Sequence, residues 1–243
     1  MLSLVAIALS YLPQEVTFTV DRVTRQALVF NPTIRSEHPP VIFAFHGHMG
    51  TSKNASFSFD LQDAWPEAIV VYMQGLPTKS HLDPTGRFNG WDVSASEDNR
   101  DIRFFDLMYR SVVEGQRADT RRVFAMGHSN GGQFVYTLWS MRGSELAGIG
   151  SFEGAGAQTV RLTPKPFFIT IGEQDQIAPP RLQHLSLNTV FRLNRSEATG
   201  NPYGPQGKLY KGTQPVVYWS YQGGHSFPAD AVPTMIQFFK SIN

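Results

Sequence analysis

The sequence predicts an α/β fold in which helices cover both faces of a mostly parallel, doubly wound sheet. Apolar runs typical of strands alternate along the chain with segments whose apolar residues recur at helical spacing. This alternation indicates parallel strands joined by crossover helices. Most of the runs are continuously apolar, as expected of strands covered on both faces. The chain has 243 residues, 41% of them hydrophobic, which suffices for one core of good size.

The first predicted element is an antiparallel hairpin at the edge of the sheet. Residues 15–20 and 24–30 alternate apolar and polar side chains around a short turn, as the strands of a hairpin do. The other strands are predicted from continuous apolar runs. These runs lie at 40–45, 68–73, 123–126, 147–152, 166–171 and 215–221.

Five segments are predicted to be helices from the spacing of their apolar residues or from a proline at one end. They are residues 60–65, 101–113, 133–141, 179–193 and 229–242. Two further segments show neither the helical nor the strand spacing of apolar residues. Residues 78–97, which contain Phe88 and Trp91, are expected to form an ordered functional loop. Residues 196–212 are rich in Gly, Pro, Asn and Lys and are predicted to be a mobile loop.

Composition limits the classes of function. With 21 basic and 20 acidic residues the net charge is +1, and no charged run marks a nucleic-acid surface. The absence of cysteine excludes disulfides, thiolate catalysis and cysteine-bound metal. Residues 1–14 begin with an apolar run that is too short to span a bilayer. They are interpreted either as a truncated secretion signal or as a segment that packs on the sheet.

Residues 15–243 are predicted to form one domain, with no membrane or nucleic-acid partner. No feature of the sequence indicates the oligomeric state.

The most informative stretch is residues 121–132 (RRVFAMGHSNGG), where a predicted strand ends in Gly-x-Ser-x-Gly and a predicted helix begins. The pentapeptide alone arises by chance roughly 0.14 times in a chain of this composition, so a plain glycine-rich loop is the alternative. The strand before it and the helix after it favour a nucleophile elbow, a sharp turn that exposes a serine hydroxyl. Ser129 is therefore the candidate nucleophile.

A nucleophilic serine needs a base to accept its proton, and His225 is the best candidate among seven histidines. It follows the last predicted strand in a glycine-rich segment, where its imidazole can reach over the sheet edge; a surface histidine is the alternative. His128 adjoins Ser129 in sequence. Because successive side chains at a tight turn point apart, His128 is expected to line the substrate pocket instead.

The base in turn needs an acid that orients it, and Asp175 is the favoured candidate. It follows a predicted strand and lies between Ser129 and His225 along the chain, the order Ser, Asp, His that is typical of this kind of site. Glu153 and Glu173 also lie near strand ends and remain alternatives.

Two backbone N–H groups are expected to bind the oxyanion. One belongs to Asn130, directly after the serine, and the other to His48 in the loop after the strand at 40–45. His46 and His48 could also suggest a metal pair, but no third ligand lies nearby in sequence. No metal and no organic cofactor is predicted.

The substrate pocket is less well defined by the sequence. Gln74, Phe88, Trp91 and residues 201–210 are expected to border the acyl group, together with His128. Trp91 would stack on an aromatic acyl group. The alternative is that Phe88 and Trp91 are core residues that close the long loop.

Five short motifs occur in the same order as in one protein family. They are FHG at 45–47, YMQG at 72–75, GHSNGG at 127–132, Gly, Asp and Pro at 172, 175 and 179, and GGH with Pro at 223–225 and 228. The chain resembles the polyhydroxybutyrate depolymerase-like and feruloyl esterase group of α/β-hydrolases, which includes carbohydrate esterases. The resemblance implies the α/β-hydrolase fold and a secreted serine esterase with Ser129 as nucleophile, Asp175 as acid and His225 as base.

The expected activity is hydrolysis of carboxylic esters through an acyl-enzyme, with a small-molecule or polymer-linked ester as substrate. Feruloyl or related hydroxycinnamoyl esters on polysaccharides are the first expectation. A polyhydroxyalkanoate depolymerase and an acetyl xylan esterase are alternatives within the same chemistry. A serine peptidase of the same fold and a non-catalytic binding protein on a hydrolase scaffold are alternatives from other classes.

Overall fold

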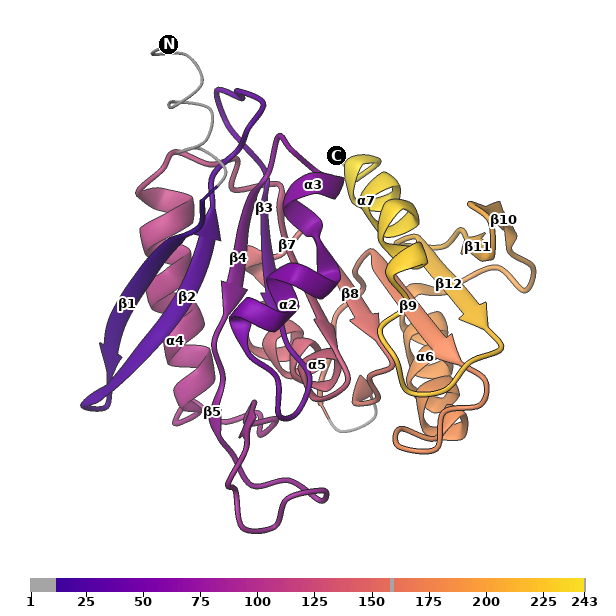
Figure 1. Cartoon of the computed structure of the whole chain (residues 1–243). Helices are drawn as coiled ribbons and strands as arrows, with labels where there is room; N and C mark the ends of the chain where they lie inside the picture. The colour runs from indigo at the N-terminus through magenta and orange to yellow at the C-terminus, as the bar shows by residue number, and fades with distance from the viewer. Residues whose placement is uncertain (1–11, 158–159, 243) are drawn as a thin grey trace.

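The structure is a computed structural model that describes residues 12–157 and 160–242. Its centre is a ten-stranded sheet in the order β1-β2-β4-β3-β7-β8-β9-β12-β11-β10 (Figure 1). The strands are β1 (Gln14–Val20), β2 (Val23–Phe30), β3 (Val41–Phe45), β4 (Ile69–Met73), β7 (Val123–His128), β8 (Gly148–Phe152), β9 (Phe167–Gly172), β10 (Asn201–Tyr203), β11 (Gly207–Tyr210) and β12 (Val216–Tyr221). The six strands from β4 to β12 in this order are parallel, and antiparallel hairpins close both edges.

Helices cover both faces of the sheet. The helices are α2 (Ser52–Phe59), α3 (Leu61–Ala64), α4 (Arg100–Tyr109), α5 (Asn130–Arg142), α6 (Pro180–Asn194) and α7 (Val232–Lys240). Short turns of π or 3-10 helix occupy Arg110–Glu114, Gly143–Glu145 and Ala229–Ala231. In Figure 1, α2, α3 and α7 lie in front of the sheet and α4, α5 and α6 behind it. The predicted fold class, a doubly wound α/β sheet with helices on both faces, is confirmed.

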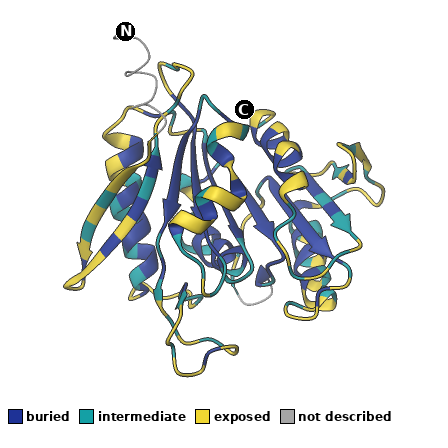
Figure 2. Cartoon of the chain, viewed as in Figure 1, coloured by how far each residue is buried: buried dark blue, intermediate teal, exposed yellow. Residues whose placement is uncertain are grey.

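The sheet separates two apolar cores, and strand β3 shows why its sequence is continuously apolar. Val41, Phe43 and Phe45 pack into the core with α4, α5 and α6. Ile42 and Ala44 pack into the core with α2, α3 and α7. All five side chains are buried, as are the inner strands in Figure 2, because alternate residues of a strand point to opposite faces.

Helix α2 was not expected from the sequence. Only three of its residues are buried, namely Ser52, Ala55 and Phe59, so its apolar face is too small to give a helical period. The helix is instead defined by its ends. The Asn54 N–H donates to Thr51 Oγ1 at 3.1 Å, which is an N-cap interaction, and Asp60 ends the helix in the left-handed conformation.

The expectation of a mobile loop at 196–212 is wrong. Strands β10 and β11 form a hairpin there, and β11 pairs with β12, so the hairpin extends the sheet. Its outer strand is an edge strand with exposed Asn201 and Pro202. Proline and polar residues are tolerated at an edge because half of the backbone groups need no partner strand, and for this reason the segment shows no strand pattern.

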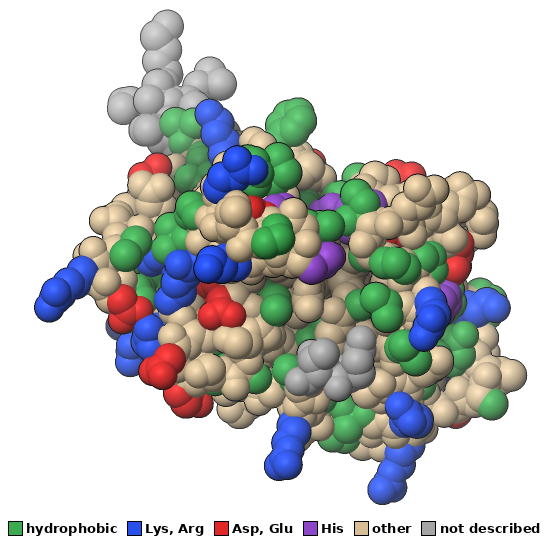
Figure 3. Space-filling model, turned by 90° about the horizontal axis from the view of Figure 1, so that it is seen from below, with side chains coloured by type: hydrophobic (Ala, Val, Ile, Leu, Met, Phe, Trp, Pro, Cys, Tyr) green, Lys and Arg blue, Asp and Glu red, His purple; other side chains and the backbone are tan. Residues whose placement is uncertain are grey.

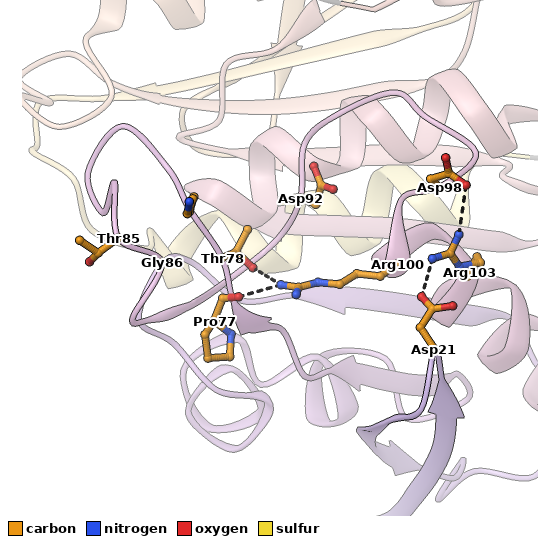
Figure 4. Close-up of a pocket in the computed structure, with 10 residues that line it drawn as sticks. Asp21, Pro77, Thr78, Thr85, Gly86, Asp92, Asp98, Arg100 and Arg103 are labelled. Carbon is orange, nitrogen blue, oxygen red and sulfur yellow. Dashed lines mark hydrogen bonds and ion pairs between the residues drawn. The ribbon is translucent and has the colours of Figure 1, made fainter.

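The long segment after β4 is an ordered loop fastened at its base. Its first and last residues pair as the short strands β5 (Leu76–Pro77) and β6 (Asn89–Gly90). The Arg100 guanidinium donates to the Pro77 carbonyl at 2.8 Å and to Thr78 Oγ1 at 2.7 Å (Figure 4). These contacts border a polar hollow of about 610 Å³, whose lining contains none of the candidate catalytic residues.

Candidate active site

Ser129 lies at a sharp turn between the end of β7 and the start of α5. Its backbone angles are φ 57° and ψ −119°, a conformation that is costly for a residue with a side chain and that is often found at active sites. Gly131 is required by the same turn, because a Cβ at this position would lie 2.2 Å from the Phe45 carbonyl oxygen. The turn has the geometry of a nucleophile elbow.

The three candidate catalytic side chains form a continuous chain of hydrogen bonds. His225 Nε2 lies 2.7 Å from Ser129 Oγ, and His225 Nδ1 lies 2.7 Å from Asp175 Oδ2. Each residue follows the carboxyl end of a different parallel strand, β7, β9 or β12, and such strand ends meet at one edge of the sheet. The arrangement leaves Nε2 of His225 free to accept the serine proton while Nδ1 donates to the carboxylate.

The Asp175 carboxylate is held rigidly. The residue is 3% exposed. Its Oδ1 accepts from the backbone N–H groups of Ile177 at 2.8 Å and Ala178 at 2.9 Å, and its Oδ2 also accepts from the Gln183 amide at 3.1 Å. These three donors fix the direction of the carboxylate, so that Oδ2 faces His225.

The two alternative acids have other partners. Glu173 accepts from the Tyr218 hydroxyl at 2.7 Å and lies 3.2 Å from His184 Nε2. Glu153 is fully buried, and its Oε2 lies 2.9 Å from Nε2 of His128, although the two atoms are not aligned for a hydrogen bond. Of the three carboxylates, Asp175 is the one in contact with His225.

Both expected oxyanion donors lie beside the elbow. The N–H of Asn130 belongs to the first turn of α5, where helical N–H groups lack an intrahelical acceptor and the helix dipole favours negative charge. The Asn130 side chain binds a different group. Its Oδ1 accepts from the Trp91 N–H at 2.7 Å and so holds the end of the loop that follows β4. His48 borders the hollows on both sides of Ser129.

Two hollows meet at Ser129. The first, of about 330 Å³, contains His48 and Asn130 and has apolar side chains on its outer wall. Those apolar residues are Leu82, Ile177 and Leu182, which are 52%, 50% and 42% exposed. The second, of about 280 Å³, contains His128 and His225 together with polar residues of α2. Figure 3, a view onto this lower face of Figure 1, shows histidine side chains among hydrophobic ones.

Solved structures of two esterases superpose on most of this chain. An acetyl xylan esterase from Aspergillus awamori superposes with a TM-score of 0.75 at 14% identity, covering 94% of this chain and 98% of the other. The chain has the α/β-hydrolase fold. A carboxylesterase from Bacillus cereus superposes on this chain with a TM-score of 0.63 at 15% identity, covering 89% and 93% of the two chains.

Sequence comparison finds one similar protein from the group that the motifs indicated. Feruloyl esterase D of Neurospora crassa is 28% identical over 150 residues, which are 58% of this chain and 49% of that protein. The match therefore spans about half the length of the relative. No protein-family model matches the chain. The resemblance to the feruloyl esterase group that the motifs indicated is confirmed by this similarity.

Trp91 and Phe88, two of the residues expected to border the acyl group, differ in their exposure. Trp91 is 1% exposed, stacks on Phe134 with ring centroids 5.4 Å apart, and donates its indole N–H to the His46 carbonyl at 2.8 Å. It is therefore a core residue that closes the loop, and the prediction that it stacks on an acyl group is corrected. Phe88 is 39% exposed and contacts His48 by its edge.

Of the other residues predicted to line the pocket, some border a hollow at Ser129 and others do not. Gln74 lines neither hollow at Ser129, which corrects the prediction that it borders the acyl group. Its Oε1 accepts from the Ser52 N–H at 2.9 Å and its amide donates to the Gly75 carbonyl at 2.9 Å. Residues 201–210 form the edge hairpin and line neither hollow at Ser129. His128 borders the second hollow.

The apolar wall of the first hollow was missed by sequence reasoning. Leu82, Ile177 and Leu182 belong to loops or to the first turn of α6, and isolated apolar residues in loops carry no periodic signal.

No cluster of three or more His, Asp or Glu side chains suited to a metal ion occurs within residues 12–157 and 160–242. Within the same ranges, none of the helices combines the length and hydropathy needed to cross a bilayer.

His46 is hydrogen-bonded to the loop that carries His48, the expected second oxyanion donor. Its Nε2 accepts from the Gly75 N–H at 2.9 Å, so its proton is on Nδ1, which donates to the Gly47 carbonyl at 2.7 Å. In a trans peptide the N–H points opposite to the carbonyl, so this bond also sets the direction of the His48 N–H. Burial of the ring lowers the pKa of His46 to about 4, and the ring is neutral at pH 7.

We predict that His46 makes the stability of the protein pH-dependent in a defined window. Its pKa is about 4 in the folded protein against 6.5 in the unfolded chain, so the unfolded state binds the proton more readily between these values. The contribution of neutral His46 to the free energy of unfolding is complete above pH 6.5 and is lost as the pH falls toward 4. The free energy of unfolding should decrease by roughly 3 kcal/mol over this range.

Urea unfolding of the wild type and of His46→Gln at several pH values measures this contribution, because the variant lacks the titrating group. The difference between the free energies of unfolding of the wild type and His46→Gln should decrease as the pH falls. His38→Gln, at an exposed position, serves as control and should show no such narrowing. A difference that stays constant from pH 7 to pH 4 would contradict the neutral, buried state of His46.

Proposed function

We propose that the chain is a serine carboxylic-ester hydrolase that works through an acyl-enzyme. The observation that supports this most directly is the chain of hydrogen bonds from Asp175 through His225 to Ser129, with both contacts at 2.7 Å. It lies at a strained elbow, next to the first turn of a helix. An activated serine beside an oxyanion site is the arrangement that acyl transfer requires.

In the proposed reaction His225 Nε2 takes the proton of Ser129 Oγ as the oxygen attacks the ester carbonyl. The oxyanion that forms accepts hydrogen bonds from the N–H groups of Asn130 and His48. Asp175 stabilises the imidazolium, which then gives its proton to the departing alcohol as the carbon–oxygen bond breaks. A water molecule repeats the sequence on the acyl-enzyme, releases the carboxylic acid and restores Ser129.

The two hollows suggest separate places for the two halves of the substrate. The alcohol must leave next to His225, which lines the second hollow with Thr51 and Asn54. The acyl group then occupies the first hollow, whose outer wall is formed by Leu82, Ile177 and Leu182. An apolar acyl group suits the first hollow. The second hollow, where Thr51 and Asn54 lie near Phe59 and Phe227, offers both polar and apolar contacts to the alcohol. A feruloyl or related ester linked to a polysaccharide has such an acyl group, and it is the substrate class that we propose.

The proposal is tested with a series of methyl esters, so that only the acyl group varies. Methyl acetate, methyl butyrate and methyl ferulate are compared by kcat/KM, with the Ser129→Ala protein as the blank. We expect hydrolysis of esters, with kcat/KM rising toward the ferulate. A preference for hydroxyalkanoate oligomers or for acetylated xylan would move the substrate to one of the alternatives. Faster cleavage of peptide anilides would indicate a peptidase, and no hydrolysis of any ester would contradict the proposal.

Secretion remains a prediction. The segment on which it depends, residues 1–14, falls mostly on residues 1–11, which lie outside the described part of the chain.

A further inference from the structure

The hydroxyl of Tyr221 lies under the loop that carries His225. It is 2.9 Å from the carbonyl oxygen of Gly224 and 2.8 Å from that of Ser226, the residues on either side of His225. It is also 3.0 Å from Oε1 of Glu153. A tyrosine hydroxyl has one proton, so at any moment it donates to one of these three acceptors. The Gly224 carbonyl also accepts from the Ser226 N–H at 3.0 Å.

The loop is shaped around the Tyr221 ring as well. A Cβ added to Gly223 would lie 2.3 Å from Cε2 of this ring, which is closer than any side chain can approach. The backbone therefore turns tightly against the ring, and only glycine permits this contact. Both the ring and the hydroxyl of Tyr221 thus limit where the next residues, including His225, can lie.

Glu153 connects this tyrosine to the nucleophile elbow. It is fully buried at the end of β8 and has a positive φ of 46°, an uncommon conformation for a residue other than glycine. Its Oε1 accepts from the hydroxyls of Tyr221 at 3.0 Å and Thr170 at 3.2 Å. Its Oε2 lies 2.9 Å from Nε2 of His128, the residue before Ser129. Contacts therefore run from the elbow to both sides of His225.

Tyr221 can act as a donor throughout the working range of an esterase. Burial raises the pKa of its hydroxyl, and the negative charge of Glu153 raises it further, so the proton is retained at neutral and mildly alkaline pH.

We propose that Tyr221 is a positioning residue for the reaction, whose hydroxyl holds the carbonyls on both sides of His225 and thereby sets the distance between His225 Nε2 and Ser129 Oγ. This inference rests on the proposed ester hydrolysis. His225 lies in the irregular segment between β12 and the turn at Ala229–Ala231, so its position depends on such contacts. A misplacement of about 1 Å between reacting groups can reduce a rate about 100-fold.

Tyr221→Phe tests the proposal, because phenylalanine keeps the ring against Gly223 and removes only the hydroxyl. We expect kcat to fall about 10- to 100-fold with little change in KM, measured well below the melting temperature of the variant. The rate at which a fluorophosphonate labels Ser129 should fall by a similar factor, since it depends on the same activation of the serine.

Tyr218→Phe is the matched control. Tyr218 lies on the same strand, and its hydroxyl also donates to a carboxylate, Glu173, at 2.7 Å, but it does not contact the His225 loop. We expect this variant to keep kcat within about twofold of the wild type. An active wild type with an equally active Tyr221→Phe variant would overturn the inference and leave the proposed function intact. A wild type that hydrolyses no ester would overturn the proposed function itself.

A pair of neighbouring glycines gives a second test that does not depend on how well Tyr221→Phe folds. A Cβ at Gly223 would collide with the Tyr221 ring, whereas a Cβ at Gly224 would meet only the Gln174 carbonyl oxygen at 3.9 Å. Gly223→Ala should therefore lower kcat at least about tenfold more than Gly224→Ala. Equal effects of the two substitutions would contradict the role of Tyr221.

Discussion

Replacing Ser129 with alanine is expected to reduce the kcat for ester hydrolysis by about 10⁵- to 10⁶-fold. The substitution removes the hydroxyl that lies 2.7 Å from His225 Nε2, and no acyl-enzyme can then form. The remaining rate would come from the oxyanion site and from substrate binding alone. The measurement is kcat on methyl ferulate and methyl butyrate under saturating conditions.

Ser56→Ala provides the control for this substitution. Ser56 is on α2, its hydroxyl donates to the Lys53 carbonyl at 2.9 Å, and it lines neither hollow at Ser129. Its replacement should leave kcat unchanged within about twofold. Retention of substantial hydrolysis in folded Ser129→Ala would show that another residue is the nucleophile.

Asp175→Asn is expected to lower kcat by about 10⁴-fold while the fold and KM change little. The asparagine amide would donate to His225 Nδ1, so the imidazole proton would move to Nε2. In that tautomer His225 cannot accept the proton of Ser129. The backbone donors at Ile177 and Ala178, which now bind the carboxylate at 2.8 and 2.9 Å, can still bind the asparagine oxygen, so the loop should keep its shape.

Glu173→Gln separates this effect from a general loss of charge beside the site. Glu173 precedes Asp175 by two residues and binds Tyr218 and His184 instead of His225. We expect the Glu173 variant to retain kcat within about threefold. If Glu173→Gln were the more damaging substitution, the acid would have to be reassigned.

The sequence was sufficient to predict the parts of the fold and site that depend on strong local patterns. Continuous apolar runs mark the inner strands, because both faces of those strands are buried. The three candidate catalytic residues each follow such a run, and parallel strands bring their carboxyl ends to one edge. For this reason the contacts among Ser129, Asp175 and His225 could be anticipated without a structure.

The features that could not be predicted depend on tertiary contacts. Helix α2 has a small apolar face and the β10–β11 hairpin is an edge with polar residues, so neither shows a period. Whether Trp91 faces the pocket or the core depends on its packing against Phe134, which brings together residues far apart in the chain. The contact of Tyr221 with Glu153 likewise joins residues 68 positions apart, and their residue types alone carry no such signal.

Covalent labelling shows whether Asp175 and His225 activate Ser129. The protein is incubated with a fluorophosphonate, and the modified residue is identified by peptide mass spectrometry. We expect one phosphonate per chain, on Ser129, with no labelling of Ser129→Ala and much slower labelling of Asp175→Asn. A label on another residue, or equal labelling rates in the wild type and Asp175→Asn, would contradict this activation.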